Sequence, residues 1–77
     1  MQPQVLSRVI GENIRRRRSE LDMTQTSLAE LVGVAQGYVS DLEAGKRTPR
    51  VSRIAKIAEV LSVPPSYLMD TQNLAPI

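Results

Sequence analysis

The sequence predicts an all-α fold made of five short helices. Apolar residues recur three or four positions apart through most of the 77 residues, a spacing that places them on one face of a helix. No stretch alternates apolar and polar residues for long enough to predict a strand. Glycines, prolines and a capping threonine separate the apolar stretches. The predicted helices cover residues 6–21, 24–32, 35–43, 51–61 and 65–70.

The first predicted helix carries one apolar stripe that includes a charged residue. The apolar members of the stripe are Leu6, Ile10, Ile14 and Leu21. Arg18 falls on the same face, where an unpaired charge would be costly to bury.

The second and third predicted helices are bounded by residues that helix ends favour. Thr24 stands where its side-chain oxygen can accept a hydrogen bond from the free N–H groups of the second helix. Gly33 follows that helix, at a position where a residue in the left-handed backbone conformation commonly ends a helix. Ala44-Gly45 ends the third helix. The apolar positions are Leu28, Ala29, Leu31 and Val32 in the second helix and Val39 and Leu42 in the third.

The fourth predicted helix has the strongest apolar pattern, and two prolines open the fifth. Pro64 and Pro65 suit a first turn, because proline is tolerated there but not further inside a helix. Residues 71–77 are expected to form a mobile tail. The apolar positions are Val51, Ile54, Ala55, Ile57, Ala58 and Leu61 in the fourth helix and Tyr67 and Leu68 in the fifth.

We expect residues 1–77 to form one domain, because a chain of this length is too short for two. A domain of this size buries only about 60% of the surface of its unfolded chain. With no cysteine available for a disulfide or a zinc site, close helix packing or dimerisation must supply the remaining stability. The predicted core residues are Ile10, Ile14, Leu28, Val39, Leu42, Ile54 and Leu61.

The composition excludes several kinds of chemistry. The chain has no Cys and no His, so it offers no thiol nucleophile, no imidazole base and no zinc ligand of those types. Two tyrosines are its only aromatic residues, too few for the stacking platforms of most single-strand binders. No apolar run is long enough to cross a membrane, and the first four residues lack the features of a secretory signal. We therefore expect a cytoplasmic protein, not an enzyme, with no cofactor and no metal.

Charge is arranged in blocks, although the net charge is only +2. Residues 8–18 contain five arginines and one acid, and residues 46–56 contain five basic residues and no acid. Between these blocks, residues 19–45 contain five acids and no basic residue. Two basic blocks suit a polyanion that touches both of them, and a solvated charged face is the alternative interpretation.

A very short turn, residues 33–35, joins the second and third helices. Helices so close together in the chain cross at a steep angle, as in a helix-turn-helix. That geometry needs a small residue where the helices touch, a glycine in the turn and branched apolar residues on the inner side of the second of the two helices. The small residue is Ala29, the glycine of the turn is Gly33, and the branched apolar residues are Val39 and Leu42. The motif that contains them spans residues 24–43.

Six short motifs stand at set spacing along residues 10–69. They are Ile10-Gly11-x-x-Ile14-Arg15-x-x-Arg18, Leu21-x-Met23-Thr24-Gln25-x-x-Leu28-Ala29, Gly33-Val34-x-Gln36-x-Tyr38-Val39-Ser40, Leu42-Glu43-x-Gly45-x-Arg47-x-Pro49, Ile57-Ala58 and Leu61-x-Val63-Pro64. Through them the chain resembles the helix-turn-helix domains of the lambda repressor and Cro class, also called the XRE family. The resemblance implies a compact, five-helix, lambda-repressor-like fold that binds duplex DNA, usually as a dimer.

The resemblance also implies that the third helix lies in the major groove and presents its outer side to base edges. The side-chain amide of Gln36 suits adenine, because the amide oxygen can accept from N6 and the amide nitrogen can donate to N7. Asp41 can only accept, which favours the amino group of cytosine, whereas Ser40 can donate or accept. Ala35 can offer a methyl group to thymine. The expected base contacts are Gln36, Gly37, Ser40, Asp41 and Ala35.

Phosphate contacts on either side of the third helix follow from the same resemblance, and such contacts position a protein without reading sequence. Gln25 is expected to hold a phosphate together with the free N–H groups of the second helix, and Arg50 to do the same at the start of the fourth. Tyr38 is either a hydroxyl donor to phosphate or a packing residue. Arg53 and Lys56 are expected to face solvent. The expected phosphate contacts are Gln25, Tyr38, Lys46, Arg47, Arg50, Arg18 and Arg15.

The family pairs an arginine at the position of Arg18 with a glutamate at the end of the recognition helix, which is Glu43 here. The resemblance therefore implies a structural ion pair between the two. The chain departs from the family pattern at Ser27, where the glutamate of a capping box is common. Ala35 is a poor cap, and Gly37 costs the helix up to about 1 kcal/mol. We therefore expect a recognition helix that is loose until DNA orders it.

These observations predict a sequence-specific, duplex DNA-binding transcriptional regulator, more specifically a repressor. We expect it to act as a homodimer on a palindromic operator. The alternative is an antitoxin-like or scaffold protein whose main partner is another protein. The expected dimer surface consists of Val63, Tyr67, Leu68 and Met69, with Leu74 and Ile77 beside them.

Overall fold

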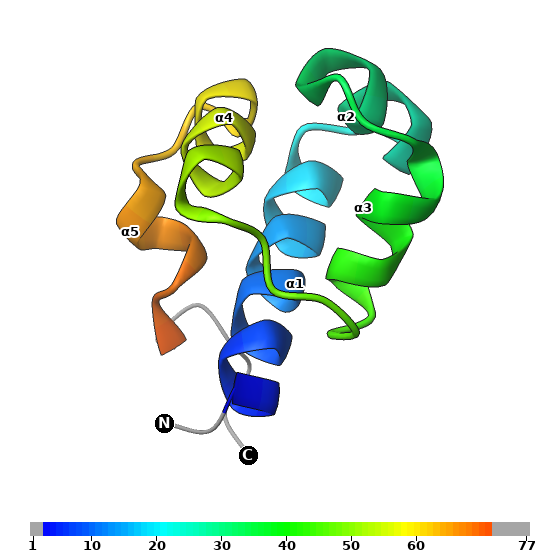
Figure 1. Cartoon of the computed structure of the whole chain (residues 1–77). Coiled ribbons are helices and arrows are strands. Elements are labelled where there is room, and N and C mark those ends of the chain that lie inside the picture. Colours follow the sequence, from blue (N-terminus) through cyan, green and yellow to red (C-terminus); the bar gives the residue numbers. More distant parts are fainter. Residues whose placement is uncertain (1–2, 72–77) are drawn as a thin grey trace.

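The computed structural model describes residues 3–71, and this part of the chain is all-helical (Figure 1). The five helices are α1 (Pro3–Glu20), α2 (Gln25–Val32), α3 (Gln36–Glu43), α4 (Val51–Leu61) and α5 (Pro65–Leu68). The predicted all-α class and the order of the helices are confirmed. Helix α1 begins three residues before the predicted start, and α5 ends at Leu68 rather than at residue 70. The predicted mobile tail lies, except for Thr71, outside the described residues.

Helix α1 is the central element, and α3, α4 and α5 all pack against it. Helix α2 packs on α3 and α4, so the core is enclosed between α1 and the remaining helices (Figure 1). All seven predicted core residues are buried. Four predicted stripe residues are instead at the surface: Leu21 and Ala55 are exposed, Leu31 is 57% exposed and Val51 is 83% exposed. Leu21, Leu31 and Val51 lie at or near helix ends, whereas Ala55 lies in the middle of α4 on a side that no other helix covers.

The ends of α2 have the predicted caps. Thr24 Oγ1 accepts a hydrogen bond from the Ser27 N–H at 3.0 Å, which satisfies one of the free donors of the first turn. Gly33 adopts the left-handed conformation with φ of 88°, and its N–H donates to Ala29 O at 2.8 Å. Helix α4 ends in the same left-handed geometry at Ser62, whose φ is 58°.

Three polar side chains tie the shorter segments to α1. Asn13 is fully buried, and its Nδ2 donates to Leu68 O at 2.9 Å and to Asp70 O at 3.0 Å. Arg17 Nε donates to Leu61 O at 2.8 Å, at the end of α4. Ser7 and Thr48 share a hydrogen bond that joins α1 to the loop before α4. The bonds of Asn13 hold the end of α5, a helix too short to be stable alone, against α1.

Helices α1 and α3 approach closely at Gly11. A Cβ atom built at this position would lie 2.1 Å from Leu42 O and 3.1 Å from Glu43 O, so only glycine fits the crossing.

None of the helices between residues 3 and 71 is long and apolar enough to pass through a membrane.

Adding one methyl group at Gly11 should destabilise the fold strongly, whereas adding it at Gly37 should stabilise it. We expect Gly11→Ala to lower the free energy of unfolding by about 3 kcal/mol, because the obstacle is backbone of α3 that cannot move aside. Gly37→Ala should raise it by about 0.5–1 kcal/mol, since nothing lies within 4 Å of the added atom and helical glycine is unfavourable. Urea unfolding followed by circular dichroism measures both. Equal effects at the two positions would contradict the close crossing of α1 and α3.

Ser62→Gly should stabilise the protein, because glycine adopts positive φ without steric cost. We expect a gain of about 0.5–1 kcal/mol in the free energy of unfolding, or a few degrees in Tm. Ser19→Gly is the control: Ser19 lies in the last turn of α1, so there the same change should lower stability. A loss of stability in both variants would show that Ser62 does not hold a left-handed cap in solution.

Candidate nucleic-acid interface

The turn between α2 and α3 sets the direction of α3. Val34 N–H donates to Ala29 O at 2.9 Å, the same oxygen that accepts from Gly33, so the chain leaves α2 abruptly. Figure 1 shows α3 running down one edge of the molecule, with α2 lying across its upper end. The inner side of α3 buries Val39 and Leu42 in the core. Its outer side is therefore free to meet a partner.

The five predicted base-contact residues share this outer side. Residues 36, 37, 40 and 41 are spaced to lie on one face of a helix, and Ala35 precedes it. Ala35, Gln36 and Gly37 are exposed, while Ser40 and Asp41 are partly exposed. None of the five is buried. As expected, Ala35 makes no side-chain cap to α3.

An ion pair joins the end of α3 to α1. Arg18 Nε lies 2.6 Å from Glu43 Oε2, and Arg18 Nη2 lies 2.9 Å from Glu43 Oε1, which is a bidentate arrangement. Arg18 Nη1 also donates to Met23 O at 2.7 Å, in the segment that leads to α2. The side chain of Glu43 is only 5% exposed. The hydrogen bond to Glu43 raises the pKa of Arg18, although burial opposes this shift.

A chain of hydrogen bonds continues from this ion pair to the outer side of α3. Gln25 Nε2 donates to Glu43 Oε1 at 3.1 Å, and Gln36 Nε2 donates to Gln25 Oε1 at 2.7 Å. Gln25 thus holds the Gln36 side chain in one orientation, and the buried carboxylate of Glu43 holds Gln25. Sequence analysis singled out both glutamines, but it did not foresee that they pair with each other.

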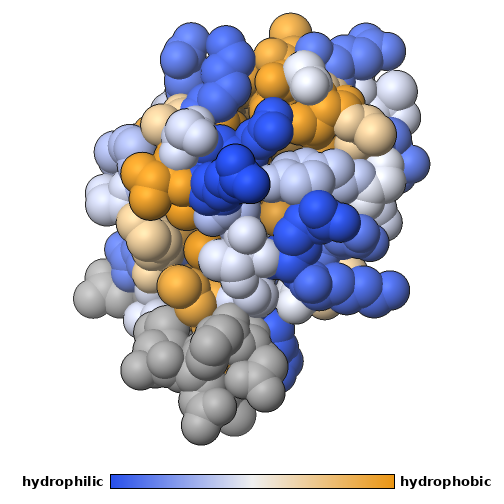
Figure 2. Space-filling model, in the orientation of Figure 1, coloured by the Kyte–Doolittle hydropathy of each residue, from blue (hydrophilic) through white to orange (hydrophobic). Residues whose placement is uncertain are grey.

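A cationic pocket of about 400 Å³ lies beside α3, at the loop before α4. It is lined by Tyr38, Arg47, Thr48, Arg50, Ser52 and Arg53. The guanidinium carbons of Arg47 and Arg53 lie over the Tyr38 ring, at 5.0 Å and 5.4 Å from its centroid. Both cations therefore contact the same aromatic ring. Figure 2 shows hydrophilic side chains gathered over this loop and the start of α4.

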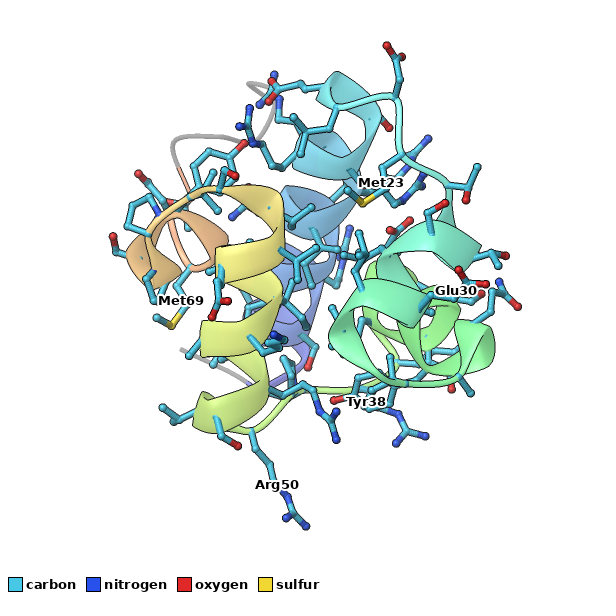
Figure 3. The ribbon with its side chains drawn as sticks, turned by 90° about the horizontal axis from the view of Figure 1, so that it is seen from above. Met23, Glu30, Tyr38, Arg50 and Met69 are labelled. Carbon is cyan, nitrogen blue, oxygen red and sulfur yellow. The ribbon has the colours of Figure 1, made fainter. Side chains whose placement is uncertain are left out.

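Three predicted phosphate contacts, Tyr38, Arg47 and Arg50, come together in this pocket. Figure 3 shows the side chain of Arg50 extending away from the body of the protein, with Tyr38 to its upper right and nearer the ribbon. The expectation that Arg53 faces solvent is wrong, because this residue is half-buried and lies over Tyr38. Its position three residues after Arg50, on the same side of a helix, is the signal that could have placed it there.

The remaining predicted contacts lie around these groups. Lys46 is exposed next to Arg47 in the loop, and Arg15 is exposed on α1, where its Nη1 lies 3.8 Å from Glu12 Oε1. Gln25 and Arg18 are partly buried.

The predicted dimer surface needs one correction. Leu68 is fully buried in the core, so its side chain is not available to a partner. Met69 is exposed, and Val63 and Tyr67 are partly exposed, on or near α5. Figure 3 shows Met69 at the α5 edge of the molecule, far from Tyr38. Leu74 and Ile77 lie outside the described residues.

The sequence of this chain is similar to those of known regulators. The uncharacterized HTH-type transcriptional regulator y4wC of Sinorhizobium fredii is 36% identical over 72 residues, which are 92% of this chain and 50% of that protein. Repressor protein C2 of Salmonella phage P22 is 30% identical over 63 residues, which are 82% of this chain and 29% of that protein. The chain thus spans about half the length of the first relative and less than a third of the second.

A solved structure and a family model complete the comparison. The crystal structure of SinR, described as the master regulator for biofilm formation, in complex with DNA matches with a TM-score of 0.75 and 34% identity. The match covers 79% of this chain and 98% of that chain. The helix-turn-helix model HTH_3 matches residues 14–68. This range begins within α1, contains α2, α3 and α4, and ends with α5. The chain therefore belongs to the HTH_3, or XRE-type, helix-turn-helix family of transcriptional regulators.

Proposed function

We propose that this protein regulates transcription by binding duplex DNA at a specific sequence, with α3 in the major groove. The observation that carries the proposal is the continuity of two surfaces: the uncovered outer side of α3 and the cationic pocket that begins at Tyr38 on that same helix. The first has the groups that read base edges, and the second has the charge that holds phosphates. SinR, to which the chain is similar, was crystallised with DNA.

Gln36 is the principal base reader in this proposal. One hydrogen of its Nε2 is used by Gln25, which leaves the second hydrogen for adenine N7 and Oε1 for adenine N6. The contact to Gln25 reduces the entropy that the side chain loses on binding DNA. Ser40 and Asp41, one turn further along, address the neighbouring base pair, and Ala35 offers a methyl group to thymine. Gly37 contributes only backbone.

The phosphates on either side of the groove are held by two sets of groups. Gln25 and the N-terminal N–H groups of α2 form one set, since one amide hydrogen of Gln25 is not used by Glu43. The pocket residues Tyr38, Arg47 and Arg50 form the other, and Arg53 joins them because it shares the Tyr38 ring. Lys46, Arg15 and Arg18 add positive charge nearby.

We further propose that the protein is a repressor that acts as a homodimer on a palindromic operator. The relative from phage P22 is named a repressor. Two-fold related copies would place their α3 helices about 34 Å apart, one turn of DNA. Val63, Tyr67 and Met69 are the apolar residues near α5 that a second copy can cover. Selection of bound duplexes from a random pool tests this, because two inverted half-sites are expected and a single half-site would contradict it.

Gln36→Ala and Arg47→Gln should separate base reading from phosphate binding. Gln36→Ala should lower the preference for the best selected duplex by about 1–3 kcal/mol and leave binding to random duplexes unchanged. Arg47→Gln should weaken binding to the best selected duplex and reduce the slope of log affinity against log salt concentration on that duplex by about one. Fluorescence anisotropy at several salt concentrations measures both effects. Binding that does not depend on salt would overturn the proposed function.

A further inference from the structure

Asp41 stands between the two surfaces of the proposed interface. It belongs to the outer side of α3, yet its Oδ2 lies 3.7 Å from Arg47 Nη2 in the cationic pocket. The other acid of α3, Glu43, is buried against Arg18, so Asp41 is the only acidic side chain that this helix offers to DNA. Arg47 is therefore held from two directions, by the carboxylate of Asp41 and by the ring of Tyr38.

The contact between Asp41 and Arg47 is easily broken. The two side chains are 42% and 51% exposed, and a separation of 3.7 Å is long for a charge-assisted hydrogen bond. A DNA phosphodiester offers the Arg47 guanidinium two anionic oxygens, as a carboxylate does, and the neighbouring phosphates of the strand add to the negative potential at the pocket. Tyr38 supports the guanidinium whichever anion it binds, so the change requires only a small rotation of the Arg47 side chain.

When Arg47 turns to a phosphate, Asp41 loses its cation. Its carboxylate then faces the groove among phosphates, where it is repelled unless a hydrogen-bond donor is within reach. The base-edge donors of the major groove are the amino groups N4 of cytosine and N6 of adenine. Guanine and thymine present acceptors at the corresponding places, so opposite them the carboxylate would stay unpaired.

We propose that Asp41 and Arg47 form an exchange pair that couples phosphate binding to base selection. In the free protein Asp41 neutralises Arg47, and on DNA a phosphate takes Arg47 while a cytosine or adenine amino group takes Asp41. On a duplex that places guanine or thymine opposite Asp41, the exchange leaves the carboxylate unpaired, so Arg47 stays with Asp41 and one phosphate contact is lost. Asp41 thus acts as a specificity-determining residue that weakens binding to wrong sequences. The inference rests on the proposed function.

A double-mutant cycle tests the coupling. The four proteins are the wild-type chain, Asp41→Asn, Arg47→Gln and the double variant, each measured against the best selected duplex and a random duplex by fluorescence anisotropy. Asp41→Asn should tighten binding to the random duplex by about fivefold, because Arg47 becomes free to bind phosphate. In the Arg47→Gln background the same change should tighten binding by less than about twofold. The ratio of selected to random affinity should fall by about tenfold in Asp41→Asn.

Glu59→Gln is the matched control. Glu59 is also exposed and also pairs with a basic side chain, Lys56, at 3.8 Å, but it lies six residues beyond Arg53 on α4 and outside the pocket. The substitution changes the net charge by the same amount, so it should alter binding to either duplex by less than about twofold. Thermal unfolding of all variants shows whether a change in binding arises from a change in folding.

The outcomes separate the two proposals. If Asp41→Asn tightens binding to the random duplex equally with and without Arg47, or more strongly without it, Asp41 acts only by direct repulsion and the exchange pair is overturned. An unchanged ratio of selected to random affinity would also overturn it. Absence of salt-dependent binding by the wild-type chain to any duplex would overturn the proposed function itself, and the exchange pair with it.

Discussion

The ion pair between Arg18 and Glu43 is the interaction on which the arrangement of the candidate interface depends. It joins α1 to the last residue of α3, and a further bond from Arg18 to Met23 O fixes the segment that enters α2. One guanidinium group therefore joins α1, the end of α3 and the segment that leads into α2. The pair is nearly enclosed, so removal of either partner would leave a buried charge, at a cost of about 3–5 kcal/mol. A small domain has little stability beyond that amount.

The same ion pair also orders the surface. Glu43 accepts from Gln25, and Gln25 accepts from Gln36, so the orientation of an exposed amide is set by a carboxylate that solvent hardly reaches. These bonds restrain the Gln36 side chain, while the expectation that α3 is loose until DNA orders it stays a prediction. The expectation of a loose helix came from local propensities alone, whereas the network acts through tertiary contacts that propensities do not include.

Sequence periodicity predicted the helices and the core well, because burial repeats every three to four residues and each core position has this signature. The Arg18–Glu43 pair came from the family resemblance and not from periodicity. Contacts between residues distant in the chain left no local pattern: Asn13 with Leu68 O, and Arg53 with Tyr38, depend on how whole helices are placed. Leu68 was misassigned for a related reason, since an apolar residue in a short terminal helix gives no signal of which neighbour covers it.

The four glycines of the chain show which positions serve folding and which do not. Gly33 and Gly45 have positive φ, and Gly11 allows two helices to touch, so the fold itself requires these three. Gly37 has ordinary helical geometry and open space around it, and nothing inside the described chain explains the absence of a side chain. Because Gly37 carries no side chain, the DNA of the proposed complex can approach the backbone of α3 more closely there than at Gln36 or Ser40. We expect the peptide backbone of α3 to come nearest to its target at this point.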